Sequence, residues 1–176
     1  AAYRGAIQAY GDYQAARVLG PRARRSRGFH FSRAIRQVGL FVFDLRTQRD
    51  PKGGRIFSDG QRNDFVEFLR ESSELPCLVL GASIPPLHVP SWAGTVAKYL
   101  LAPFAGDFAD RLSSDAFVED RDWLLETLRK HQSDHPEQDA VFLSGDIHVC
   151  GAWRADWNSE SPPIHQVISS PITHDI

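Results

Sequence analysis

The chain has no methionine among its 176 residues and only two cysteines, Cys77 and Cys150. So few cysteines cannot form the disulfide framework of a small secreted scaffold, and that class of protein is excluded. Both cysteines lie in or beside apolar strand-like runs, and we expect buried free thiols. Free thiols favour a reducing compartment, so the sequence predicts a cytoplasmic location. A start at Ala1 without methionine predicts a processed, trimmed or partial polypeptide.

Long hydrophobic runs are missing as well. No apolar run reaches the roughly 20 residues that cross a bilayer, and no basic segment followed by an apolar one marks a signal peptide. The formal net charge is −2, which gives no overall field toward nucleic acid or an anionic membrane. We therefore expect no nucleic-acid partner and no membrane span.

The main basic feature is a loop that contains Arg22, Arg24, Arg25 and Arg27. A solvated surface is the expected role of such a cluster, and the alternative is a rim that attracts anions near a phosphate site. A nucleic-acid binder that used the arginines up to Arg36 would also need interleaved aromatic side chains, and no such motif accompanies them.

Buried apolar runs alternate with amphipathic segments, a pattern typical of a layered α/β fold with a mixed sheet. A turn at residues 36–39 is expected to use Gly39 for an unusual backbone angle. Residues 85–115 are rich in proline and predict a long insertion. The expected helices cover 2–19, 58–72 and 117–131, and the expected strands cover 29–35, 40–43, 78–80, 141–143, 149–153 and 164–169.

The sharpest local signal is Gly145-Asp146-Ile147-His148, directly after an apolar strand. In an extended chain Asp146 and His148 point to the same side, because the strand period is two. A carboxylate and an imidazole together suit a borderline metal ion such as zinc, manganese or iron. The alternatives are structural: Asp146 can cap a turn, and His148 can be a hydrogen-bonded core histidine.

Asp44 and Arg46 form a second candidate pair, at the end of the apolar run Leu40–Phe43. Strand ends of this kind are where α/β proteins place their sites, and a guanidinium suits a phosphate ligand. We therefore expect these residues to contact substrate or to support the metal ligands. The alternative is a structural ion pair at the strand end.

These residues carry a resemblance to a known family. Phe43-Asp44-Leu45-Arg46-Thr47-Gln48-Arg49 resembles the Asp-x-Arg-x-x-Arg stretch of PhoD-like (alkaline phosphatase D-type) metallophosphatases, and Leu143-Ser144-Gly145-Asp146-Ile147-His148-Val149 resembles their Leu-Ser-Gly-Asp-Val-His segment. The matches occur in the family's order over most of residues 3–173. Further matches are Gln61 with the helix after it, the strand at Cys77 to Gly81, Asp115, the Asp120-Arg121 helix, and Gln166 to Pro171.

The resemblance implies part of a calcineurin-like metallophosphoesterase fold, a four-layer αββα sandwich with mixed sheets. It implies phosphoester hydrolysis in the longer parent protein, by in-line attack of a water activated by two metal ions. Iron, calcium, manganese or zinc are the candidate ions, and Asp146 and His148 are the implied ligands.

The same resemblance implies that residues 1–176 are the C-terminal portion of the domain. The family's early metal ligands come from strands N-terminal to every segment seen here, so the isolated chain is expected to be incomplete as an enzyme. A phosphoester substrate is the expected partner of the parent. The alternative function is a catalytically inactive module of the same fold that acts in protein interaction.

Overall fold

The computed structural model describes residues 2–20, 28–50, 53–87, 117–146, 150–156 and 162–170. Helices and strands alternate along these residues, as the apolar pattern predicts. The elements in chain order are α1 (Ala2–Tyr10), the π-helical turn η1 (Gly11–Ala15), α2 (Ala16–Leu19), β1 (Phe31–Ile35), β2 (Val38–Val42), α3 (Asp59–Glu71), β3 (Cys77–Gly81), α6 (Val118–Asp134), β4 (Asp139–Ser144), β5 (Gly151–Ala155) and β6 (Ile164–Ile168).

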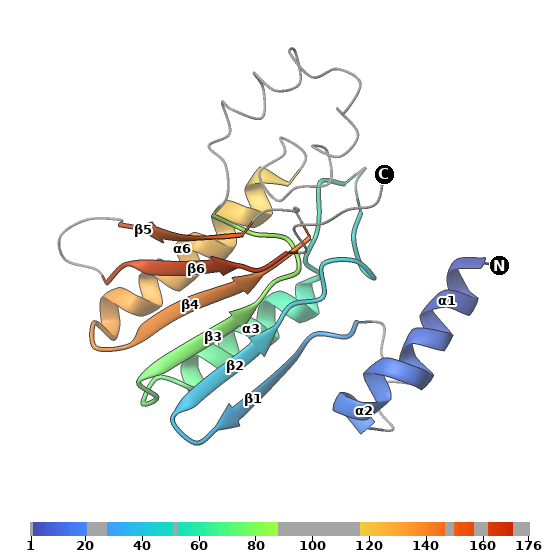
Figure 1. Ribbon diagram of the computed structural model, residues 1–176, viewed down its shortest axis with the longest axis horizontal. Helices are drawn as coiled ribbons and strands as arrows, with labels where there is room; N and C mark the ends of the chain where they lie inside the picture. Colours follow the sequence, from blue (N-terminus) through green and yellow to red (C-terminus); the bar gives the residue numbers. More distant parts are fainter. Residues whose placement is uncertain are drawn as a thin grey trace, which may run out of the picture.

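The strands form one six-stranded mixed sheet in the order β1-β2-β3-β4-β6-β5 (Figure 1). The pairings β2–β3, β3–β4 and β4–β6 are parallel, whereas β1 and β5 pair antiparallel at the two edges. Parallel strands need long crossover connections, and here α3 and α6 supply two of them. The expected mixed α/β architecture is confirmed.

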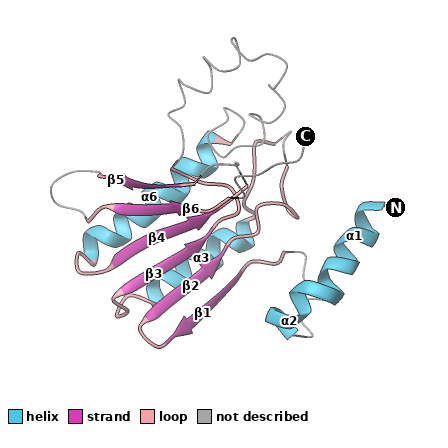
Figure 2. Cartoon of the chain, viewed as in Figure 1, coloured by secondary structure: helices cyan, strands magenta, loops and turns pink. Residues whose placement is uncertain are grey.

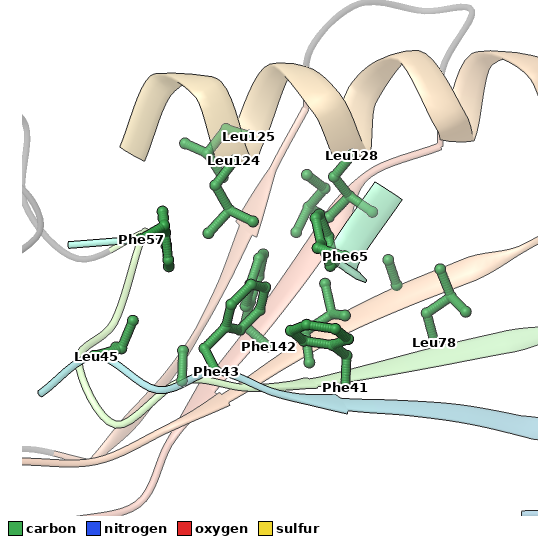
Figure 3. Close-up of a cluster of buried hydrophobic side chains, with 14 of the residues drawn as sticks. Phe41, Phe43, Leu45, Phe57, Phe65, Leu78, Leu124, Leu125, Leu128 and Phe142 are labelled. Atoms are coloured by element: carbon green, nitrogen blue, oxygen red, sulfur yellow. The ribbon is translucent and has the colours of Figure 1, made fainter. Parts of the chain in front are cut away.

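Helices α3 and α6 cover the same face of the sheet (Figure 2). Leu124, Leu125 and Leu128 of α6 point toward Phe41, Phe43 and Phe142 of the strands, and Phe65 of α3 lies among them (Figure 3). Every one of these side chains is buried. Burial of a large apolar side chain contributes about 1.5–3 kcal/mol, so this layer holds the fold together.

The opposite face of the sheet is apolar but has no helix layer among the described residues. Along the parallel strands, buried positions alternate with half-buried or exposed ones, as the strand period of two requires. Leu143 and Val167 are 47% and 43% exposed. The apolar side chains that the parallel strands place on this face are Val38, Leu40, Val42, Cys77, Val79, Val141, Leu143 and Val167, and the same alternation adds Asp139 and His165.

The N-terminal helical segment has a small apolar contact of its own with the chain before β1. Ala15 and Phe29 are buried against each other, with Ile7, Ala16 and Leu19 packed around them. The Tyr10 and Phe29 rings meet edge to face, with their centroids 4.8 Å apart. Gly20, at a φ of 63°, ends this helical segment, as predicted. No helix among the described residues is long and apolar enough to cross a membrane.

Two local expectations are wrong. Gly39 lies inside β2, and the positive φ of the β1–β2 turn belongs to Arg36. A side chain at position 39 would lie 3.0 Å from side-chain atoms of Leu78 and Ser72, so close packing favours glycine there. Both cysteines are free, but Cys150 is exposed beside the edge strand β5, not buried. Most of the expected insertion at 85–115 lies outside the described residues.

A buried carboxylate ties the loop before α3 to α6. Asp120 is 0% exposed, and its carboxylate accepts hydrogen bonds from the backbone N–H groups of Ile56 and Phe57 and from the Arg62 guanidinium. The Arg62 guanidinium also lies over the Trp123 ring, 4.5 Å from its centroid. A buried charge with this many donors is satisfied, and its removal leaves the donors unsatisfied.

Replacing this carboxylate is therefore expected to be costly. Asp120→Ala should lower the free energy of unfolding by about 3–5 kcal/mol, because it leaves the Arg62 charge and two backbone N–H groups unpaired. The matched control is Asp122→Ala on the same helix, whose exposed carboxylate pairs with Arg121 and should cost less than about 1 kcal/mol. Urea denaturation of both variants measures the difference, and equal costs would contradict the role given to Asp120.

His131, in the last turn of α6, predicts a pH dependence of stability. Burial lowers the pKa of His131, the hydrogen bond that its Nε2–H donates to the side-chain oxygen of Gln138 opposes that shift, and the neighbouring His135 adds to it. As the pH falls below about 6.5, the unfolded chain therefore takes up a proton at this position before the folded chain does. Stability should fall between about pH 6.5 and the lower folded pKa.

His131→Gln should weaken this acid dependence, whereas Lys130→Gln on an exposed neighbouring position should leave it unchanged. Urea denaturation at pH 7.5 and at pH 5.5 provides the comparison. The same loss of stability toward pH 5.5 in the wild type and in His131→Gln would show that His131 does not contribute to it.

Candidate functional site

The candidate site lies at the end of the sheet formed by the C-terminal ends of four parallel strands, β2, β3, β4 and β6. The register pairs Val42 with Gly81, Gly81 with Leu143, and Leu143 with Val167. The segments after β2, β3, β4 and β6 therefore leave the sheet side by side, which is where open α/β sheets place ligands.

Asp44 organises the segment after β2. Its carboxylate accepts hydrogen bonds from the backbone N–H groups of Phe29 at 2.8 Å, Thr47 at 2.9 Å and Arg46 at 3.1 Å, and from the Thr47 hydroxyl. Asp44 is 9% exposed, so these donors take up most of its surroundings. The carboxylate thus fixes a turn, and this turn presents the side chain of Arg46.

A buried glutamine holds the same segment from the helix side. The Gln61 side chain accepts from the Asp44 backbone N–H at 2.7 Å and donates to the Asp44 carbonyl at 3.1 Å. Gln166 of β6 binds the backbone of Leu87 in the same two-way manner, at 2.8 Å for both hydrogen bonds. Asp44 and Leu87 lie outside the strands, and the side-chain amides satisfy the backbone N–H and carbonyl groups of these two residues. Both loops are thereby anchored to the core.

Arg46 and Asp146 meet across the strand ends. An Arg46 guanidinium nitrogen donates to an Asp146 carboxylate oxygen at 2.9 Å, although the two residues lie 100 positions apart in the sequence. The side chains are 54% and 51% exposed, so this ion pair stands in contact with solvent. It joins the segments that follow β2 and β4.

The backbone at Asp146 is not extended. Strand β4 ends at Ser144, and Asp146 has a φ of 65°, in the left-handed region that few residues other than glycine adopt. The period of two therefore does not carry past Ser144, and it does not relate Asp146 to position 148. His148 lies outside the described residues, and its role as a metal ligand stays a prediction.

A cavity of about 810 Å³ opens beside these segments. Tyr3 and Tyr10 of α1 form one wall, and the ends of β2, β3 and β4 form the other. Its polar side is lined by Arg46, Ser83 and Ser144. The buried hydroxyl of Ser144 has no hydrogen-bond partner among the described residues. The cavity thus combines apolar walls with a polar end at the strand termini, a combination common in ligand sites.

Among the described residues, the side chains do not fit a metal ion by themselves. No group of three or more histidine, cysteine, aspartate or glutamate side chains lies close enough to hold one. The Asp146 carboxylate can supply one ligand, and it is bound to a guanidinium.

The structure brings three of the predicted site residues to one sheet edge. Asp44, Arg46 and Asp146 follow the strand ends as expected, but Asp44 directs its carboxylate into its own turn. Gln166 and Ser144 belong to segments that resemble the family, but the sequence did not predict their place at this end of the sheet. A signal for Gln166 was available, because it holds an inward-facing position of an otherwise apolar strand, where an amide needs a specific partner.

These elements define an open, mixed α/β sheet with α3 and α6 on one face and a polar site at the ends of its parallel strands. A solved structure titled "Structure of PhoD" has this fold: it aligns with a TM-score of 0.68 over 97% of the present chain, at 14% sequence identity. The chain spans 34% of the length of that PhoD chain. No family model matches the sequence, and no curated protein does. The likeness shows a PhoD-like fold.

The glutamine that anchors Asp44 can be tested against a second buried glutamine. Gln61→Leu should lower the free energy of unfolding by about 2–4 kcal/mol, because the Asp44 N–H and carbonyl groups both lose their partner. Gln132 is equally buried, but its amide has no partner among the described residues. Gln132→Leu should therefore be neutral or stabilising by up to about 1 kcal/mol.

Urea denaturation gives the stabilities, and hydrogen exchange at the Asp44 amide provides a local readout. Gln61→Leu should accelerate exchange at Asp44, and Gln132→Leu should not. Slow exchange at Asp44 in the Gln61 variant would show that the loop is held by other contacts.

Proposed function

We propose that the longer polypeptide to which this chain belongs hydrolyses phosphoesters, and that this chain supplies one α/β half of the site. The observation that carries the proposal is the placement of Arg46 and Asp146 at the ends of β2 and β4, within a fold that matches PhoD over 97% of the chain. The motifs around these two residues resemble those of PhoD-like metallophosphatases, which implies the same class of reaction.

The two side chains have complementary chemistry for this reaction. A guanidinium offers paired N–H donors to phosphate oxygens, and Arg46 lines the cavity. A carboxylate is a suitable ligand for iron, calcium, manganese or zinc, and Asp146 stands next to the cavity-lining Gly145. The rest of the metal ligands would come from His148 and from the parent polypeptide.

The open face of the sheet supports an origin in a larger domain. A sheet with helices on one face still has to bury its second face, and an apolar face is normally covered by another layer. We propose that a second sheet of the parent polypeptide covers Leu143, Val167 and their neighbours, which completes a sandwich. The site then lies between two layers and is shielded from bulk water.

The proposal predicts that the longer polypeptide hydrolyses a chromogenic phosphoester. Asp146→Asn should reduce turnover at least about a hundredfold, because it removes a proposed metal ligand, and changes to groups that only support such ligands already cost about 10- to 100-fold. Asparagine tolerates the left-handed backbone of position 146, so the fold should be retained.

The control is Asp156→Asn, which removes an equally exposed carboxylate at the opposite edge of the sheet. It should leave turnover within about twofold of the wild type, since surface substitutions of this kind change little. Turnover in Asp146→Asn equal to that of the control would reject the role of Asp146. A longer polypeptide that folds, binds metal ions and hydrolyses no phosphoester would reject the function, in favour of an inactive interaction module.

A further inference from the structure

We propose that the cavity between α1 and the strand ends binds a neutral aromatic group, and that the phosphoester substrate is therefore an aryl ester. The phosphoester part rests on the proposed function, whereas the binding of the aromatic group is tested without catalysis. The cavity measures about 810 Å³. Sites for small organic ligands measure about 300–1,000 Å³, so a fused two-ring system has room here.

The floor of the cavity contains bare backbone at Gly81. The register places Gly81 between Val42 and Leu143, and all three residues line the cavity. Val42 and Leu143 are apolar side chains of the open face, so the missing side chain of Gly81 leaves a gap between them. A Cβ atom at position 81 would lie 3.2 Å from the Val42 side chain and would narrow this gap.

Aromatic side chains form the opposite wall. Tyr3 and Tyr10 of α1 line the cavity together with Phe29 and Phe31. Tyr3 and Tyr10 are 62% and 43% exposed, so their rings are accessible to a ligand. Pairs of aromatic rings contribute more than their buried area alone. This wall therefore favours an aromatic group over an aliphatic one of the same volume.

The aromatic wall is held in place without a ligand. The Tyr3 hydroxyl donates to the Thr47 carbonyl at 2.5 Å, and the Thr47 N–H donates to the Asp44 carboxylate at 2.9 Å. Farther along the helical segment, Ala15 is buried against Phe29. The cavity is thus largely preformed, so a ligand loses little affinity through ordering of the protein.

Charge is confined to one end of the cavity. Among the described residues that line it, the charged ones are Asp44 and Arg46, both after β2. The Asp44 carboxylate binds its own turn, and Arg46 pairs with Asp146. Burial of a charged group without a partner is costly, so the aromatic part suits a neutral group. The phosphate of an aryl ester would then lie at the end formed by the strand termini.

The cavity leaves most of the open face for the second sheet proposed above. It uses only the last row of the parallel strands, the row that contains Gly81 and Leu143. The preceding row of Leu40, Val79 and Val141 does not line the cavity. A covering layer and a ligand therefore occupy different parts of this face.

Two matched alcohols test the aromatic preference on the 176-residue chain. Naphthol and decahydronaphthol share a two-ring skeleton and a hydroxyl group, and only naphthol is aromatic. An NMR titration of the Gly81 amide should show saturable binding of naphthol, about two- to tenfold tighter than that of decahydronaphthol. Equal or tighter binding of decahydronaphthol would overturn the aromatic assignment, and so would a Gly81 signal that does not respond to naphthol.

A substitution on the floor tests the position of the ligand. Gly81→Ala should weaken naphthol binding on the order of tenfold, because the added methyl group overfills the gap. Gly5→Ala on α1 is the matched control, since a Cβ atom there meets nothing within 4 Å, and it should leave the affinity unchanged. Wild-type affinity in Gly81→Ala would overturn the proposed position.

A second variant acts on the aromatic wall and leaves the sheet untouched. Tyr10→Leu should weaken naphthol binding about two- to tenfold and leave decahydronaphthol within about twofold. Tyr13→Leu is the control, because Tyr13 is 77% exposed on the same helical segment and does not line the cavity. Equal affinities in the two variants would overturn the role of this wall.

The longer polypeptide tests the link to the substrate. There, Gly81→Ala should raise the KM for naphthyl phosphate about tenfold and leave the KM for methyl phosphate within about twofold. An equal rise for both esters would overturn the assignment of the aryl group to the cavity. Naphthol that binds the 176-residue chain and not the longer polypeptide would also overturn it, because the parent's own residues would then fill the cavity.

The outcomes separate this inference from the proposed function. If naphthol binds beside Gly81 as expected and the longer polypeptide hydrolyses no phosphoester, the aromatic site stands and the proposed function falls. If the longer polypeptide hydrolyses methyl phosphate and naphthol does not bind beside Gly81, the function stands and the aromatic site falls.

Discussion

The parallel pairing of β2, β3, β4 and β6 places four carboxyl ends at one edge of the sheet, and every contact of the candidate site depends on this register. A shift of one residue would turn each inward-facing side chain to the opposite face. Phe41, Leu80 and Phe142 would then leave the helix layer, so the core enforces the register. The same apolar burial that stabilises the fold thus decides which residues of distant segments meet.

Buried glutamine side chains bind the loops to the core. Gln61 and Gln166 each bind both the N–H and the carbonyl of one residue in a segment beyond a strand end. At the opposite edge of the sheet, Gln138 donates to the carbonyls of Ser72 and Leu75. An amide suits this task because it matches both backbone groups and has no charge to desolvate. The backbone of Asp44 and of Leu87 is therefore fixed to the core by these side chains.

The apolar pattern predicted most of the fold, because burial on one side of a strand or helix leaves a direct trace in the sequence. The helix from Asp59 to Glu71 and the strand runs near Leu78 and Phe142 were found in this way. The boundaries of β1 and β5 were less accurate, since edge strands bury fewer side chains. The turn at Arg36 was misassigned, because the packing that favours Gly39 comes from Leu78 and from the end of α3, which are distant in the sequence.

The candidate site was predicted in part. The motifs identified Asp44, Arg46 and Asp146, but the pattern could not show that the Asp44 carboxylate binds its own turn or that Arg46 meets Asp146. Those contacts depend on the φ of 65° at Asp146 and on a pairing between residues 100 positions apart. Neither leaves a local trace in the sequence. Side chains two positions apart point to the same side only while the chain stays extended. Here the chain leaves the extended conformation after Ser144, just before the candidate ligand Asp146.

The open apolar face has a thermodynamic consequence for the chain. Any layer that packs on it binds the folded form and not the unfolded one, so it stabilises the fold by mass action. The unfolding midpoint of this half then depends on how strongly its companion layer binds to it. A substitution on Leu143 or Val167 would act on that linkage even where it leaves the intrinsic stability of the chain unchanged.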